Sequence, residues 1–145
     1  MPIKSGITGP DDSGNSVVNH YFWKIKNQTC MEAKQFAENW IKSWNSHNME
    51  DILSHYSDDI EITTPMIQMA LGSGNGTLKG KEAVADYWKK AMTKIPDLHF
   101  ELYEVTEGIG SVALYYKSVL NKKAIEVMFF NDAGKVNKMF AYYTN

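Results

Sequence analysis

Hydrophobic residues recur at helical spacing early in the chain and at strand spacing later. Between positions 36 and 44 they lie three or four residues apart, which predicts a helix of about four turns. A capping-box pattern at 29–32 marks its start. Asn48 can cap a short second helix that carries Tyr56 on its buried face. A third helix is expected from about residue 81 to residue 94.

The strand pattern begins with a short alternation of apolar and polar residues that ends at Thr64. Residues 65–80 contain glycines at 72, 74, 76 and 80, and we expect them to form a loop that acts as a mobile lid or as the rim of a pocket. Four further strands are predicted, separated by turns rich in Gly, Asn and Asp: 98–107, 111–120, 123–131 and 135–144. Three helices followed by an antiparallel meander indicate the α+β class, with the sheet curled around the helices and a hollow between them.

Length and composition indicate one domain at residues 29–145. It follows an N-terminal extension, residues 1–28, that we expect to be partly disordered. The net charge of −2 and the absence of a basic stripe argue against nucleic acid as a partner. No apolar run has membrane length, and the start lacks the apolar segment of a signal peptide. The single cysteine, Cys30, fits a reducing compartment, so we expect a cytoplasmic protein without a membrane partner.

Glu126 is the only charged residue within an apolar run, residues 124–130. This run predicts a strand that is covered on both faces. Desolvation there would raise the pKa of its carboxyl towards neutral pH, where a general acid or base works best. The alternative is a structural glutamate paired with Lys117 or Lys138.

Several large side chains would line the hollow between the helices and the sheet, and each of them could equally be ordinary core. Together they favour a pocket for a flat or lipophilic small molecule. These residues are Trp40, Trp44, Tyr56, Trp88, Met128, Met139 and Tyr143.

Metal and cofactor chemistry is not indicated. The four histidines are scattered without metal-ligand spacing, and no phosphate-binding glycine motif is present. All the basic residues are lysines, which excludes bidentate arginine clamps from any mechanism. We therefore expect neither a metal nor a cofactor.

The outward face of the predicted sheet is also apolar, since both parities of residues 124–130 are hydrophobic and Phe140 and Tyr142 add to that face. Such a face needs a second cover. The same sheet of another subunit is the simplest one, so we expect a two-fold homodimer.

Three segments carry a resemblance to a known family: residues 48–62, 80–88 and 129–136. In these segments the chain resembles the SnoaL-like and ketosteroid-isomerase-like branch of the NTF2-like (cystatin-like) proteins. The resemblance covers about residues 30–144 and implies a cone in which three N-terminal helices pack on a curved antiparallel sheet and enclose a pocket. One such scaffold hosts isomerases, hydrolases, cyclases and binding modules.

The resemblance also assigns positions to the catalytic groups of the relatives. The isomerase base falls at Thr64, the tyrosine of the oxyanion hole falls at Trp40, and the second, protonated acid falls at Glu126. Only the last position keeps its chemical type, so steroid isomerisation is disfavoured. The arginine and two aspartates of the epoxide-hydrolase branch fall at Tyr116, Ser118 and Ala141, so that machinery is absent as well.

Two hypotheses on function follow. In the first, Glu126 carries out acid/base chemistry of the isomerase, cyclase or hydrolase type on a small hydrophobic compound. A hydrogen-bond partner such as Tyr116, Ser118 or His99 would then share its pocket, and Tyr116 and Ser118 would line that pocket together with Thr64 and the large residues above. In the second, the protein is a non-catalytic ligand-binding or dimeric interaction module.

Overall fold

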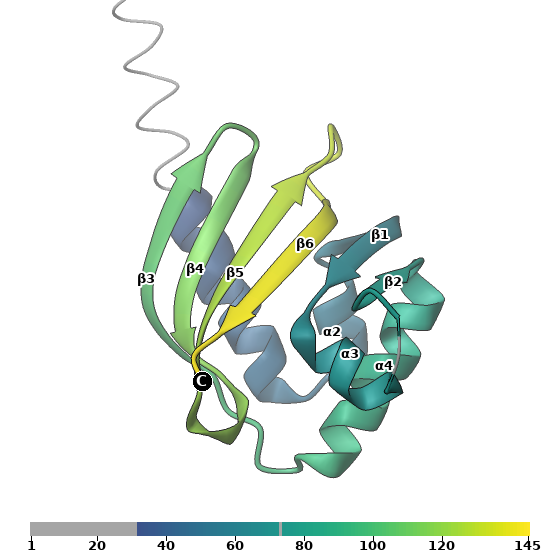
Figure 1. The fold of residues 1–145 in the computed structure, drawn as a ribbon. Coiled ribbons are helices and arrows are strands. Elements are labelled where there is room, and N and C mark those ends of the chain that lie inside the picture. Colours follow the sequence, from purple (N-terminus) through teal and green to yellow (C-terminus); the bar gives the residue numbers. More distant parts are fainter. Residues whose placement is uncertain (1–31, 73) are drawn as a thin grey trace, which may run out of the picture.

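A computed structural model describes residues 32–72 and 74–145, and it confirms the α+β cone class (Figure 1). The described helices are residues 32–46, α2 (Met49–Leu53), α3 (Pro65–Leu71), α4 (Lys81–Lys94) and the 3₁₀ turn η1 (Val119–Asn121). The strands are β1 (Tyr56–Thr63), β2 (Thr77–Lys79), β3 (Glu101–Gly108), β4 (Ser111–Lys117), β5 (Lys123–Phe130) and β6 (Val136–Tyr143). The N-terminal extension and residues 29–31, which include Cys30 and most of the predicted capping box, lie outside the described residues.

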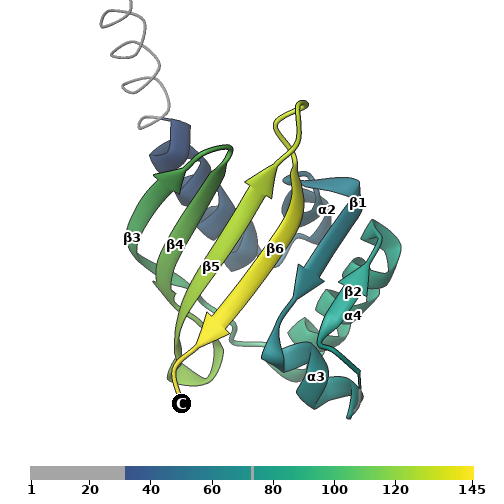
Figure 2. The same cartoon turned by 45° about the horizontal axis from the view of Figure 1, so that its top comes forward.

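The six strands form one mixed sheet in the order β2-β1-β6-β5-β4-β3, which corrects the expected antiparallel sheet. β3 to β6 form the predicted antiparallel meander, but β1 runs parallel to β6, with Ile62 opposite Met139. Parallel neighbours need a long connection, and the whole chain between β1 and β6 supplies it. The last strand therefore lies in the interior of the sheet (Figure 2).

The helices pack on one side of the sheet, where the first helix crosses behind the meander and α4 lies behind β2 (Figures 1 and 2). Their apolar faces meet the inward faces of the strands, and Trp40, Ile52, Ile60 and Leu114 are fully buried there. Burial of such side chains is the main driving force for this arrangement. No helix in the described ranges is both long and apolar enough to cross a membrane.

The second helix begins as predicted, because the Asn48 side chain accepts a hydrogen bond from the backbone N–H of Asp51 at 3.1 Å. Tyr56 is buried, but it belongs to β1 and not to this helix.

The expectation that residues 65–80 form a loop is wrong, because they contain α3 and β2. Thr64 is extended, as the residue before a proline prefers to be, and its hydroxyl accepts a hydrogen bond from the N–H of Met66 at 3.1 Å. Pro65 then occupies the first helical position, and Gly72 ends the helix in the left-handed conformation with φ at 69°. β2 returns along β1, where the hydroxyls of Thr63 and Thr77 are 2.8 Å apart.

The strand predicted at 98–107 starts later than expected, as β3 at Glu101, because residues 98–100 are tied to the first helix. The Asn45 side chain donates to the carbonyl of Phe100 at 2.9 Å and accepts from its N–H at 2.7 Å. These bonds replace the partners that a sheet would supply for Phe100. Leu98 and Phe100 are therefore directed into the core beneath the helices.

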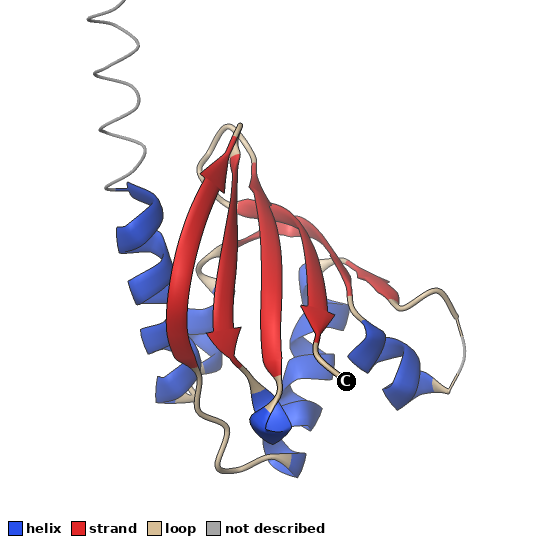
Figure 3. Ribbon diagram, turned by 60° about the vertical axis from the view of Figure 1, so that its left-hand side comes forward, coloured by secondary structure: helices blue, strands red, loops and turns tan. Residues whose placement is uncertain are grey.

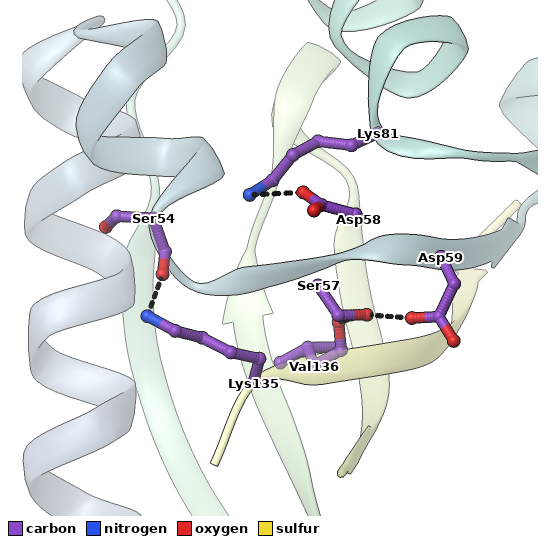
Figure 4. Close-up of polar contacts among 7 residues, drawn as sticks. All are labelled: Ser54, Ser57, Asp58, Asp59, Lys81, Lys135 and Val136. Carbon is purple, nitrogen blue, oxygen red and sulfur yellow. Dashed lines mark hydrogen bonds and ion pairs between the residues drawn. The ribbon is translucent and has the colours of Figure 1, made fainter. Parts of the chain in front are cut away.

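Polar contacts join β1 to its neighbours at the end opposite α3 (Figure 4). Lys135 donates to the backbone carbonyl of Ser54 at 2.7 Å, and the N–H of Val136 donates to the carbonyl of His55 at 2.9 Å. Lys81 and Asp58 form an exposed ion pair at 3.6 Å. The two backbone contacts fix where β6 enters the sheet beside β1, whereas the exposed pair adds little stability.

Candidate functional site

A cavity of about 550 Å³ lies between the helices and the inward face of the sheet. Its walls come from the first helix, α3, α4, residues 95–100, the inward faces of β4 to β6, and η1. Figure 3 shows η1 and α3 near the same end of the sheet, and both contribute residues to the cavity wall. The predicted site residues that border it are Trp40, Trp44, Thr64, Trp88, Tyr116, Ser118, Glu126, Met139 and Tyr143. Tyr56 and Met128, which we expected at this wall, do not border it and are buried in the core.

Strand register places Glu126 and Tyr116 together. Leu114, Glu126 and Ala141 lie opposite one another on β4, β5 and β6, and all three side chains are buried. Tyr116 follows Leu114 by two residues, so it faces the same side and is a diagonal neighbour of Glu126. Its hydroxyl donates a hydrogen bond to Oε2 of Glu126.

Glu126 has no lysine partner within the part of the chain that the structure describes, which argues against the structural alternative. Lys117 follows Tyr116 directly and thus points to the outward face, and Lys138 lies opposite the outward-facing Phe129. The ion pairs found among the described residues are Lys79–Glu61 and Lys81–Asp58. The buried carboxyl is therefore held by a neutral phenol.

Burial raises the pKa of Glu126 from 4.5 to about 7, and the hydrogen bond from Tyr116 opposes this rise. The pKa of Tyr116 is raised well above its ordinary value, first by burial and then by the Glu126 carboxylate. The phenol therefore stays protonated while the carboxyl takes up and releases a proton near neutral pH. A carboxyl with such a pKa is suited to general acid/base catalysis.

Four further hydroxyl-bearing residues also border the cavity, namely Thr64, Tyr87, Ser118 and Tyr143. Thr64 and Ser118 are buried, and Tyr143 is half-buried. Burial and the Glu126 carboxylate both raise the pKa of Tyr143, so this group is a hydrogen-bond donor and not a base. Among the described residues of the wall, Glu126 is the only carboxyl or imidazole group.

Trp40 does not present its indole N–H to the cavity, contrary to the role considered for it. Its Nε1 donates to the hydroxyl of Tyr56 at 2.8 Å, within the core. The Trp40 ring packs edge-to-face on Tyr116, with ring centroids 5.3 Å apart, and Phe100 packs on Tyr116 at 5.0 Å. These aromatic neighbours fix the orientation of the phenol that holds Glu126.

Sequence reasoning missed two parts of the wall. Met66, Met69 and Leu71 come from α3, which was expected to be a loop. Tyr87, Lys90 and Lys94 come from α4, of which only Trp88 was expected at the wall. The spacing of Tyr87, Ala91 and Lys94 on one side of this helix was a signal that could have found the second group.

Sequence and structure comparisons agree on one family. The SnoaL-like domain matches residues 37–131. A SnoaL-like protein of unknown function from Burkholderia thailandensis is 42% identical, covers 78% of this chain and 94% of its own, and superimposes with a TM-score of 0.76. The chain belongs to the SnoaL-like family.

More distant SnoaL-like and NTF2-like structures share the fold alone. A SnoaL-like family protein from Agrobacterium tumefaciens, described as a candidate isomerase, is 12% identical, covers 79% of this chain and 99% of its own, and has a TM-score of 0.64. An NTF2-like protein of unknown function from Burkholderia xenovorans is 13% identical, covers 79% of this chain and 84% of its own, and has a TM-score of 0.63. No curated protein matches this SnoaL-like sequence.

Proposed function

We propose that this SnoaL-like protein binds a small hydrophobic or aromatic molecule in its cavity and uses Glu126 as a general acid/base on it. One observation carries the proposal: a buried carboxyl at the cavity wall, held by Tyr116, with a pKa raised to about 7. The apolar lining supports a ligand of this kind, because side chains such as Trp44, Trp88 and Met139 surround the remaining space.

The chemistry requires two protonation states of Glu126. The ionised carboxylate takes a proton from an acidic C–H or O–H group of the ligand, and the neutral acid returns it to the same or another atom. Tyr116 holds Oε2, so the transfer takes place at Oε1, for which no hydrogen bond is found among the described residues. Ser118 and Tyr143 are positioned along the same wall to donate to a ligand oxygen on which charge develops.

A probe of base strength in apolar pockets tests this proposal without knowledge of the natural substrate. A general base removes the C3 proton of 5-nitrobenzisoxazole, the N–O bond breaks, and a coloured cyanophenolate forms. We expect saturable turnover that rises with pH through about 7, where Glu126 ionises. Glu126→Gln should lower the rate by roughly 10²-fold or more.

Glu104→Gln is the matched control, because Glu104 is an exposed glutamate on β3. It should leave the rate unchanged. Equal rates for the wild-type protein and Glu126→Gln would reject Glu126 as the base.

The second candidate function is ligand binding without catalysis. It is favoured by the absence of a second carboxyl or imidazole group among the described residues that border the cavity. This reading expects a flat aromatic ligand to bind with similar affinity to the wild-type protein and to Glu126→Gln, with no turnover in either.

We also propose that the outward face of the sheet forms a two-fold homodimer interface. Tyr115, Ile125 and Tyr142 lie opposite one another on β4, β5 and β6 and are 38%, 45% and 56% exposed. Such an apolar row across adjacent strands can pack on the same row of a second copy, because a two-fold axis brings the same surface of both subunits into contact.

Sedimentation velocity tests the homodimer. The wild-type protein should sediment as a dimer, and Ile125→Lys, which places a charge at the centre of the row, should sediment as a monomer. Ala83→Lys is the control, because Ala83 is an exposed residue of α4, on the opposite side of the sheet from the row. A wild-type monomer at high protein concentration would refute the proposal.

A further inference from the structure

Charge is distributed unevenly along the cavity. Its buried part carries one ionisable acid, Glu126, which is 4% exposed. Two exposed lysines of α4, Lys90 and Lys94, also border the cavity and lie one helical turn apart. The cavity thus has a single titrating carboxyl deep inside and a pair of cations at its mouth.

These two lysines have no ion pair within the described residues, whereas Lys79 and Lys81 each pair with an acid. Asp86 lies one turn before Lys90 but does not reach it within 4 Å. A lysine in the last turn of a helix stabilises the carbonyl end, which accounts for Lys94. That effect is confined to the last turn, so it does not account for Lys90.

We propose that the ligand is an amphipathic anion, with an apolar or aromatic body in the cavity and a carboxylate, sulfonate or phosphate group held by Lys90 and Lys94. This inference rests on the proposed function and adds the substrate class to it. Lysines act as point charges and lack the planar fork of arginine, so the site accepts any of these anionic groups. Placing the anion beside Glu126 would set two like charges close together in a buried site, so it stays at the mouth.

The orientation of the ligand follows from this charge arrangement. The anionic group faces solvent, the apolar body lies against Met66 and Tyr87, and the far end reaches Glu126. The group on which Glu126 acts is therefore the end of the molecule remote from its permanent charge.

Two fluorescent probes with the same ring system test the inference. 8-Anilinonaphthalene-1-sulfonate carries an anion, and N-phenyl-1-naphthylamine is its neutral counterpart. Lys90→Gln/Lys94→Gln should weaken binding of the sulfonate roughly three- to thirtyfold. Its affinity for the neutral probe should not change. Added salt should weaken binding of the sulfonate to the wild-type protein and leave the neutral probe unaffected.

The control for charge removal is Lys42→Gln/Lys89→Gln, because both lysines are exposed and neither borders the cavity. It should bind both probes like the wild-type protein. Ala91→Trp blocks the mouth and should abolish binding of both probes, which shows that they occupy the cavity and not the apolar sheet face.

The possible failures are distinguishable. The anionic ligand class is overturned if Lys90→Gln/Lys94→Gln binds the sulfonate as tightly as the wild-type protein does, or if it loses affinity equally for both probes. In either case, binding of the neutral probe to the wild-type protein would still support the apolar cavity as a ligand site. No binding of the neutral probe to the wild-type protein, or binding that persists in Ala91→Trp, would reject the cavity as a ligand site and this inference with it.

Discussion

Removal of the Tyr116 hydroxyl should raise the pKa of Glu126 above its value of about 7. The phenol donates to the carboxylate inside the cavity wall, and it is the interaction that opposes the effect of burial. Tyr116→Phe keeps the ring that packs on Trp40 and Phe100 and deletes only the donor. The charged form of Glu126 then loses more stabilisation than the neutral form does, because a hydrogen bond to a charged group is the stronger one.

The size of the effect follows from hydrogen-bond energies. A bond to a charged group contributes about 1.5–3 kcal/mol, and a bond between neutral groups contributes about 1 kcal/mol. The difference is roughly 1 kcal/mol or slightly more, and 1.36 kcal/mol corresponds to one pKa unit. Tyr116→Phe should therefore move the pKa of Glu126 to about 8.

Carbon NMR of protein labelled at the glutamate carboxyl measures this directly. The Glu126 signal is the one that Glu126→Gln removes, and its shift between pH 4 and pH 10 gives the pKa. Tyr115→Phe is the control, because Tyr115 is the next residue along β4 and faces outward. The reasoning is refuted if Glu126 titrates near 4.5 in the wild-type protein, or if Tyr116→Phe leaves its pKa unchanged or lowers it.

Three further predictions concern stability. The folded state holds the Glu126 proton more tightly than the unfolded state does, since the pKa is about 7 against 4.5. The free energy of unfolding contributed by this group should thus fall by roughly 3 kcal/mol as pH rises from below 4.5 to above 7. In denaturant titrations the free energy of unfolding of Glu126→Gln should not show this fall. Parallel curves of unfolding free energy against pH for the two proteins would contradict the prediction. Tyr56→Phe leaves the Trp40 N–H buried without its acceptor and should cost about 1–3 kcal/mol in chemical denaturation, whereas Tyr142→Phe on the exposed face should be neutral. Thr64→Ala removes the cap of α3 and should lower the free energy of unfolding by about 1 kcal/mol, most of which Thr64→Ser should restore.

Sequence patterns predicted the elements whose signals are local. Asn48 caps its helix through its own side chain, and the apolar period of α4 lies within the helix itself, so both were found. The α3 signals were also local: a threonine, a proline at the first helical position and a closing glycine. The glycines that follow favoured a loop over these helix signals. A helix of seven residues is also too short to show a clear hydrophobic period.

The remaining features depend on contacts between distant segments. Alternation of apolar residues predicts that β1 and β6 are strands, but it does not determine that they pair in parallel. The apolar run around Glu126 indicated a buried carboxyl, yet the choice of Tyr116 as its partner depends on the register across the η1 turn. Trp40 and Trp44 lie four residues apart on the same face of the first helix, so the sequence pattern does not distinguish them. Only the packing of the folded protein determines that the N–H of Trp40 reaches Tyr56.

The interior position of β6 has a consequence for the order of folding. β6 is the last described strand, and it joins the β1–β2 pair to the β3–β5 hairpins. During synthesis the two parts of the sheet exist before the strand that connects them, so the sheet cannot close until β6 has emerged from the ribosome. Met139, Ala141 and Tyr143 of this strand also border the cavity, so the cavity wall is completed in the same late step.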